Sequence, residues 1–320
     1  MSTSPSPTVG LAVDVPLPLP DLVRKDRVLW PYAASIAMFH VLCGLAFVPW
    51  LFTWPALIAM VVGVFAFGQG INLCYHRLLT HRSFVTPKWF EHFLVIVALC
   101  CAQDTPVKWV AIHRFHHQHS DHQEDPHSPL VNFLWAHIAW LIVRNPGAHN
   151  LDVYGKYARD LLKDPFYMRL EKQKLLFVWI YLAHAAVFTA VGGLIGLVVG
   201  GDVMTAARYA ASMLLWGVVV RTVVVWHITW SVNSLTHLFG YQRYETGENS
   251  RNNWLIGLLA VGEGWHNNHH HDPASASNQH RWWEIDPTFY VIKALEVVGL
   301  AKKVRKPRHI RHAERDATGS

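Results

Sequence analysis

The stretch from Trp54 to His81 reads WPALIAMVVGVFAFGQGINLCYHRLLTH. Most of it is apolar, and its end carries two histidines, His76 and His81, separated by four residues. A helix needs about 20 apolar residues to span a bilayer. The stretch therefore predicts a membrane-spanning helix over residues 54–75 that brings two imidazoles to its polar end.

Three further stretches have this length and character, namely residues 28–52, 175–199 and 209–232. The short turn at 50–55 joins the first pair of spans, and Gly200, Gly201 and Asp202 mark a tight turn between the second pair. We therefore expect two helical hairpins. The expected fold class is an all-α integral membrane protein, with four transmembrane helices and a helical cap formed by residues 77–174 and 233–300. The cap would hold a histidine-rich di-metal site.

Composition supports this class. Of 320 residues, 52% are hydrophobic and only 16% are charged, whereas soluble domains average about a quarter charged. Tryptophan, which is enriched where a membrane meets water, occurs 15 times. The four cysteines, Cys43, Cys74, Cys100 and Cys101, lie in apolar stretches without a CxxC pair, which predicts buried, reduced thiols.

Lysine and arginine predict the orientation. They flank the ends of the spans that lie away from the hairpin turns (Arg24, Lys25, Arg77), whereas the two turns carry only Arg208 at an edge. The positive-inside rule then places both termini and the cap in the cytoplasm. Residues 1–27 are Pro-rich and are expected to form a disordered cytoplasmic tail, residues 28–300 one domain, and residues 301–320 a basic tail. Its place after the spans favours contact with lipid headgroups over nucleic acid.

Histidine is the outlier, with 22 residues. Most of the clustered ones fall in three motifs and one single site: His76-Arg-Leu-Leu-Thr-His81, His113-Arg-Phe-His116-His117, His266-Asn-Asn-His269-His270 and Asn233-Ser-Leu-Thr-His237. A helix turns about 100° per residue, so His116 and His117 diverge by about 100° and suit two adjacent metals. The wider spacing of His76 and His81 fits a point where a helix ends and the chain bends.

These nine histidines exceed one coordination sphere, which predicts two metal ions. Imidazole suits zinc, copper, iron and nickel. A structural zinc usually takes four ligands including cysteine, and no cysteine lies near the clusters. A pair of ions bound only by nitrogen suits redox chemistry with oxygen, and iron is the expected metal.

In this order, the motifs resemble those of the membrane fatty acid desaturase family, most closely its acyl-CoA Δ9 (stearoyl-CoA type) branch. The resemblance covers residues 30–300 and includes the strings Asp125-Pro-His and Glu263-Gly-Trp-His-Asn-Asn-His-His. It implies that one iron is bound by His76, His81, His117 and His270, with a water held by Asn233. It implies that the other iron is bound by His113, His116, His237, His266 and His269. Asp121 and Asp125 lie near these motifs and could accept ring N–H bonds that orient the ligands.

The resemblance also implies a bent acyl tunnel. Its kink would be lined by Trp109, Thr229 and Trp230, and its far end by Val64 and Gly68. Gln103 and Asp104 fall where the family contacts the head of its substrate, and Asp104 replaces an asparagine there. Separately, Arg221 lies inside the fourth apolar stretch, where a charge is costly and usually functional or paired.

The implied reaction is oxygen-dependent introduction of a cis double bond, at position 9, into a long saturated acyl chain of an acyl-CoA or a lipid. The chain has no HPGG or CxxC string, so we expect a separate electron donor, a ferredoxin, rubredoxin or cytochrome, with its reductase. Two alternatives remain. One is a hydroxylase or ketolase of the same histidine-rich superfamily, and the other is a membrane metal transporter or sensor.

Overall fold

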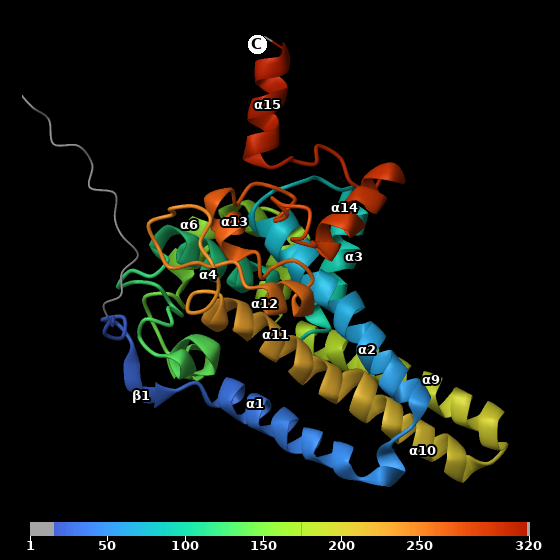
Figure 1. The fold of residues 1–320 in the computed structure, drawn as a ribbon. Helices are drawn as coiled ribbons and strands as arrows, with labels where there is room; N and C mark the ends of the chain where they lie inside the picture. Colours follow the sequence, from blue (N-terminus) through green and yellow to red (C-terminus); the bar gives the residue numbers. More distant parts are fainter. Residues whose placement is uncertain (1–15, 174, 319–320) are drawn as a thin grey trace, which may run out of the picture.

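The computed structural model describes residues 16–173 and 175–318, and it is mostly helical (Figure 1). The elements of the first half are β1 (Arg24–Val28), α1 (Trp30–Cys43), η1 (Gly44–Phe47), η2 (Pro49–Leu51), α2 (Trp54–Gln69), η3 (Gly70–Thr80), α3 (Lys88–Leu99), α4 (Pro106–His119), η4 (Trp135–Ala139), α5 (Trp140–Ile142), β2 (Val143–Arg144), α6 (Leu151–Tyr157), α7 (Arg159–Leu162) and α8 (Pro165–Lys172). Those of the second half are α9 (Leu176–Gly200), α10 (Val203–Met213), η5 (Leu214–Val220), α11 (Arg221–Leu235), α12 (Trp254–Leu259), α13 (His266–His271), α14 (Pro287–Val297) and α15 (Arg308–Thr318).

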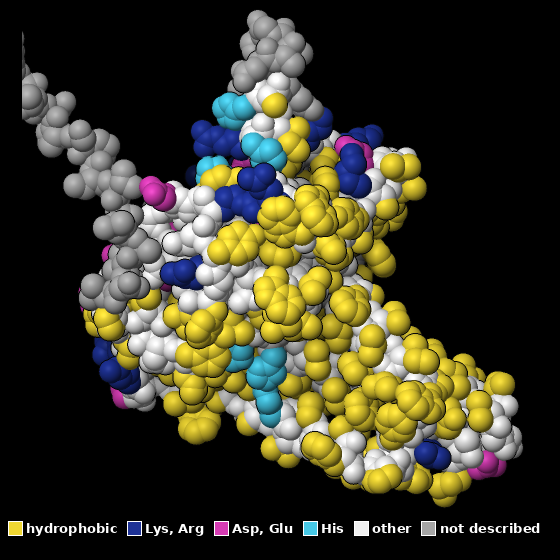
Figure 2. Space-filling model, in the orientation of Figure 1, with side chains coloured by type: hydrophobic (Ala, Val, Ile, Leu, Met, Phe, Trp, Pro, Cys, Tyr) yellow, Lys and Arg dark blue, Asp and Glu magenta, His cyan; other side chains and the backbone are white. Residues whose placement is uncertain are grey.

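Four continuous helical stretches are long and apolar enough to cross a membrane: Trp30–Phe47, Trp54–Thr80, Leu176–Gly200 and Val203–Leu235. They coincide with the four stretches predicted from the sequence. In Figure 1 they extend away from the cap. The α1 helix contacts α11, where His40 Nε2 lies 3.0 Å from His227 Nε2. Hydrophobic side chains cover this part in Figure 2, whereas lysine and arginine gather near α14 and α15.

The second stretch is longer than the predicted 54–75. It continues as the π-helical segment η3 to Thr80, and the His81 amide donates to the His76 carbonyl at 3.1 Å. A π-helix bonds each residue to the one five positions away. The five-residue spacing of His76 and His81 therefore matches the local helix, and the chain bends only afterwards, at Arg82 (φ 52°).

The fourth stretch begins at Val203, earlier than the predicted residue 209. Gly201 adopts a left-handed conformation (φ 71°), and the Asp202 side chain then accepts a hydrogen bond from the Thr205 amide at 2.9 Å. An aspartate in this position satisfies an otherwise unpaired amide of the first helical turn. The helix therefore starts directly after the turn.

The N-terminal segment differs from the expectation of a disordered tail over residues 1–27. Residues 1–15 lie outside the described residues, but residues 16–27 pack on the cap. The Leu17 amide donates to the Leu130 carbonyl at 3.0 Å, and β1 pairs antiparallel with β2. These hydrogen bonds pair backbone amides and carbonyls of the N-terminal segment. The Pro-rich composition alone gave no indication of such partners.

The core of the cap lies where η3 packs against α3 and α4. A Cβ atom on Gly70 would meet the backbone of Ala98 at 2.6 Å, so glycine permits η3 and α3 to approach closely. One face of α3 is buried through Leu94 and Val95, while Trp89 and Phe93 are exposed. This two-sided character is that of an interfacial helix.

Candidate metal centre and cavity

The nine histidines of the sequence motifs come together in two groups, delivered by four parts of the fold. They lie at the end of η3, on α4, directly after α11 and on α13. Within each group, one ring nitrogen of every histidine lies within 4.8 Å of the others. The first histidine group contains His76, His81, His113, His117 and His269. The second histidine group contains His116, His237, His266 and His270.

The nitrogens converge closely within each group. In the first group, His269 Nε2 lies 3.1 Å from His76 Nε2 and 3.0 Å from His117 Nε2. In the second group, His266 Nε2 lies 3.1 Å from both His237 Nε2 and His270 Nε2. Each set therefore presents its imidazoles to one common point.

This division differs from the one that the resemblance implies. His113 and His117 stay together because residues four apart share a face of a helix, and their Nε2 atoms lie 3.1 Å apart. His266 and His270 form the equivalent pair on α13. Consequently His113 and His269 join the first group and His270 joins the second, whereas His116 and His117 separate, as their angular divergence predicts.

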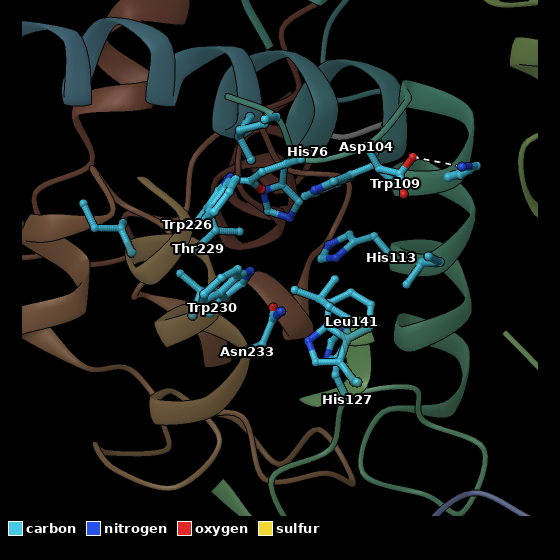
Figure 3. Close-up of a pocket in the computed structure, with 18 of the residues that line it drawn as sticks. His76, Asp104, Trp109, His113, His127, Leu141, Trp226, Thr229, Trp230 and Asn233 are labelled. Carbon is cyan, nitrogen blue, oxygen red and sulfur yellow. Dashed lines mark hydrogen bonds and ion pairs between the residues drawn. The ribbon is translucent and has the colours of Figure 1, made fainter. Parts of the chain in front are cut away.

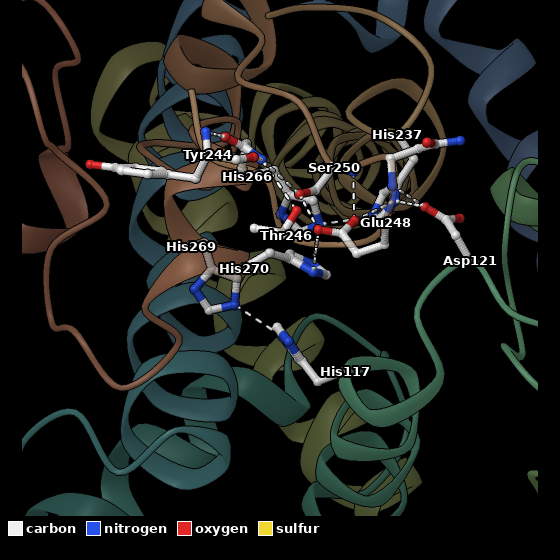
Figure 4. Close-up of polar contacts among 12 residues, drawn as sticks. His117, Asp121, His237, Tyr244, Thr246, Glu248, Ser250, His266, His269 and His270 are labelled. Carbon is white, nitrogen blue, oxygen red and sulfur yellow. Dashed lines mark hydrogen bonds and ion pairs between the residues drawn. The ribbon is translucent and has the colours of Figure 1, made fainter. Parts of the chain in front are cut away.

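Carboxylates hold the outer nitrogen of four of these histidines. Nδ1 lies 2.9 Å from Glu263 in His76 and 2.9 Å from Asp125 in His116. The second group is held similarly, with 2.8 Å between His237 and Asp121 and 3.5 Å between His270 and Glu248. Figure 4 shows the last two carboxylates beside their histidines. Such contacts fix the ring orientation and leave Nε2 to face a metal.

The sequence suggested this role for Asp121 and Asp125, but it missed Glu248 and Glu263. The available signal was weak. Glu263 lies three residues before His266, inside a string that matches the family, and Glu248 follows a glycine in an irregular segment. No periodic pattern marks either residue.

The electrostatics of the two groups suit metal binding. Burial, followed by neighbouring histidines, lowers the pKa of most of them, which leaves neutral rings with free lone pairs. These are His81, His113, His117, His266, His269 and His270. His237 differs: burial lowers its pKa, but Asp121 raises it overall to about 9. His81 Nε2 is buried without a hydrogen-bond partner, and a metal ion would satisfy it.

A cavity of about 320 Å³ adjoins the histidines (Figure 3). His76, His113, His266 and Asn233 form part of its wall, and aromatic and aliphatic side chains line most of the rest. Several lining residues lie on α1 and α11, including Tyr32, Ile36, Trp226 and Trp230. The cavity therefore places an apolar volume directly beside the first and second histidine groups.

Five of the seven predicted substrate residues line this cavity, namely Gln103, Asp104, Trp109, Thr229 and Trp230. Gln103 Nε2 donates to Thr229 Oγ1 at 2.9 Å and so ties two of them together. Val64 and Gly68 lie elsewhere. Val64 packs against the core beside η3, and Gly68 is buried within α2, so the structure does not place them at the end of this cavity.

One end of the cavity is polar. Tyr32 OH donates to one oxygen of Asp104, and Lys108 Nζ lies 3.1 Å from the other. Gln103, His149 and Tyr154 also line the cavity. Asp104 therefore pairs with Lys108, the one lysine among the described residues that line the cavity.

Comparison with known proteins agrees with this arrangement. A family model described as "Fatty acid desaturase" matches residues 49–298. An sn-1 stearoyl-lipid 9-desaturase of Anabaena variabilis is 39% identical over 88% of this chain and 95% of its own length. An sn-2 palmitoyl-lipid 9-desaturase of Nostoc sp. (strain 36) is 37% identical over 89% and 93%, and an acyl-CoA 5-desaturase of Anemone leveillei is 41% identical over 85% and 78%. The chain therefore belongs to the fatty acid desaturase family and is an oxidoreductase that introduces double bonds into fatty acyl chains.

Proposed function

We propose that the two histidine groups each bind one iron ion, with Asn233 holding a water of the ion bound by the first group. The convergence of imidazoles, most of them held neutral by burial, supports this assignment, because a metal ion would satisfy the nitrogens that face one another, including the unpartnered Nε2 of His81. The asparagine lines the cavity together with His76 and His113 of the first group and His266 of the second. When bound, a pair of irons supplies the activation of O2 that the reaction requires.

The substrate would be a long saturated acyl chain, and the double bond would form at position 9, as named for the cyanobacterial relatives. The protein's own residues would bind the chain and exclude water. Trp226 and Trp230 stack along one wall of the cavity, with ring centroids 5.8 Å apart. The contact between Gln103 and Thr229 would hold the bend next to the histidines.

The observation that carries this proposal is the adjacency of the apolar cavity and the two histidine groups. It favours acyl oxidation over metal transport, because a transporter places its ligands along a pathway near the bilayer midplane. In this chain, eight of the nine histidines lie outside the four apolar stretches, and His76 lies near the end of one. The aromatic wall of the cavity, which includes Trp109 and Trp230, favours desaturation over hydroxylation, because it would hold a bent chain with two neighbouring methylenes near the histidines.

For topology, we propose two helical hairpins with both termini and the cap in the cytoplasm, and a single desaturase domain over residues 28–300. The electron donor would be a separate protein, a ferredoxin, rubredoxin or cytochrome. A second cavity of about 240 Å³, lined by His81, His117, His270 and Glu248 among others, opens beside the histidines. It offers a donor a short route to the metals.

Expression in a host without desaturases, with an electron donor supplied, tests the proposal. Gas chromatography with mass spectrometry of the lipids should show a new double bond at position 9, and purified protein should contain about two irons. The His269→Ala variant should abolish the product. An unchanged fatty-acid profile with an active donor present would overturn the proposed function.

A further inference from the structure

Arg221 is a fully buried arginine within the fourth membrane-length helical stretch. Its guanidinium donates to the Cys100 carbonyl at 3.0 Å and the Gly217 carbonyl at 3.2 Å, and it lies 2.8 Å from His184 Nε2. The remaining contacts are Cys101 Sγ at 4.0 Å and the Phe67 ring at 4.3 Å. Among the described residues no carboxylate bonds to it, so neutral groups alone offset the cost of its burial.

Cys100 gives this arginine a particular position. It is the C-cap of α3, and the end of a helix carries a partial negative charge and unpaired carbonyls. The guanidinium therefore caps the C-terminus of α3, because its positive charge and its hydrogen bond stabilise the carbonyl of Cys100. This contact places Arg221 at the start of the 100–105 loop, which connects α3 to α4.

The 100–105 loop is conformationally strained and forms part of the cavity. Ala102 (φ 51°) and Asp104 (φ 70°) both adopt left-handed conformations without being glycine. Such conformations persist only where surrounding contacts hold them. Ala102, Gln103 and Asp104 all line the cavity, so the strain lies in the wall of the substrate site.

Tyr32, Tyr75 and Lys108 hold Asp104, and one helical stretch, α11, holds the rest of the loop through three further contacts. Arg221 bonds to Cys100, the Trp226 indole N–H donates to the Cys101 carbonyl at 2.8 Å, and Thr229 accepts from Gln103 at 2.9 Å. These bonds run in order along α11 and along the loop. Arg221 is the first of the three, and it does not line the cavity.

We propose that Arg221 is a positioning residue that fixes the 100–105 loop and thereby sets the position of the new double bond. This inference rests on the proposed function. The position of a double bond is counted from the carboxyl end of the chain, and the loop carries Asp104 at the polar end of the cavity and Gln103 beside Thr229. Moving the loop relative to the histidines therefore moves the methylenes that face them.

The test compares Arg221→Gln and Arg221→Lys with a matched control, Arg208→Gln. Arg208 lies on the same helical stretch and also donates to carbonyls, those of Trp50 and Phe52, but at the opposite end from the cavity. Double-bond positions are measured by mass spectrometry of derivatised fatty acids. A misplacement of about 1 Å can change a rate by about a hundredfold. We expect Arg221→Gln to raise the share of product at neighbouring carbons at least about tenfold, Arg221→Lys to raise it less, and Arg208→Gln to leave the positions unchanged.

A second measurement follows the loop without activity. N-ethylmaleimide labelling of Cys100 and Cys101 should become faster in Arg221→Gln than in the parent protein, while labelling of Cys74, which is buried in η3, should not change. Unchanged double-bond positions in Arg221→Gln, or equally accelerated labelling of Cys74, would overturn the inference and leave only a general stabilising role. Absence of any double bond in the parent protein would instead reject the proposed function.

Discussion

Glu263 Oε2 lies 2.9 Å from Nδ1 of His76, in a contact between η3 and the segment preceding α13. The same carboxylate accepts from Arg77 at 2.8 Å and from the Asn278 amide at 3.0 Å. Burial raises the pKa of Glu263, but Arg77 and His76 lower it overall to about 2. Glu263 therefore stays ionised, accepts a hydrogen bond from the Nδ1–H of His76 and leaves His76 Nε2 free to bind a metal.

The first prediction concerns this carboxylate. Glu263→Gln keeps the volume but weakens the acceptor for His76, so metal affinity or activity should fall about 10- to 100-fold, as is typical for residues that orient metal ligands. Iron content after dialysis against a chelator measures it. Asp286→Asn is the control, because Asp286 also pairs with Arg77 at 2.8 Å but is not the partner of a grouped histidine. Equal iron loss in both variants would contradict the role given to Glu263.

The second prediction separates neighbouring histidines. His270 belongs to the second histidine group, whereas His271 stacks on Tyr244 with ring centroids 3.7 Å apart. His270→Ala should abolish desaturation and lower the iron content from about two ions toward one, and His271→Ala should retain both irons. Metal analysis and lipid profiling of the two purified variants provide the comparison. Full iron occupancy in His270→Ala would exclude it as a ligand.

Much of the fold and the set of nine histidines could be predicted from the sequence, because both depend on local patterns. Apolar length predicts the four stretches, and the divergence of His116 and His117 predicts two groups. The assignment of His113 and His269 required the structure. A motif predicts the angles between histidines on one helix. Which of the two groups a histidine joins depends on how α4 and α13 pack against each other.

Two other features depend on packing that the sequence does not display. The π-helical form of η3 arises where Gly70 lies against α3, and no sequence period distinguishes it from an α-helix. The partners of Arg221 lie more than 30 residues away at Cys100 and His184. A charge inside an apolar stretch predicts that partners exist, but only the tertiary structure identifies them.

The third prediction concerns pH. Asp160 accepts from Arg114 at 2.8 Å and from Arg82 at 2.5 Å, so it links the residues that follow His113 and His81. Burial raises its pKa, but hydrogen bonds from Arg114 and Arg82 lower it overall to about 2, below the unfolded value of about 3.9. A lowered pKa adds stability above the unfolded pKa, and this stability is lost as pH falls toward the folded pKa.

Asp160→Asn should therefore be less stable than the parent protein, by about 1 kcal/mol or less, because the carboxylate is 40% exposed and screened by solvent. The difference should be constant from about pH 5 to 8 and should shrink between about pH 4 and 2. Thermal unfolding of the metal-free protein in detergent measures it. Asp152→Asn, at an exposed position on α6, serves as the control. A difference that grew on acidification would contradict this account.

The last prediction concerns the head of the substrate. Asp104 engages Lys108 at 3.1 Å and accepts from Tyr32, so the lysine at the polar end of the cavity is not available to a phosphate. Asp104→Asn restores the amide of the acyl-CoA branch and frees that lysine. We expect the ratio of acyl-CoA turnover to lipid turnover to rise a few-fold. A partly exposed ion pair contributes about 1 kcal/mol, and this free energy corresponds to a few-fold change in the ratio. Competition assays with both substrates measure the ratio, and the double variant with Lys108→Met should return it to the parent value. If Asp104→Asn alone leaves the ratio unchanged, the ion pair does not govern headgroup choice.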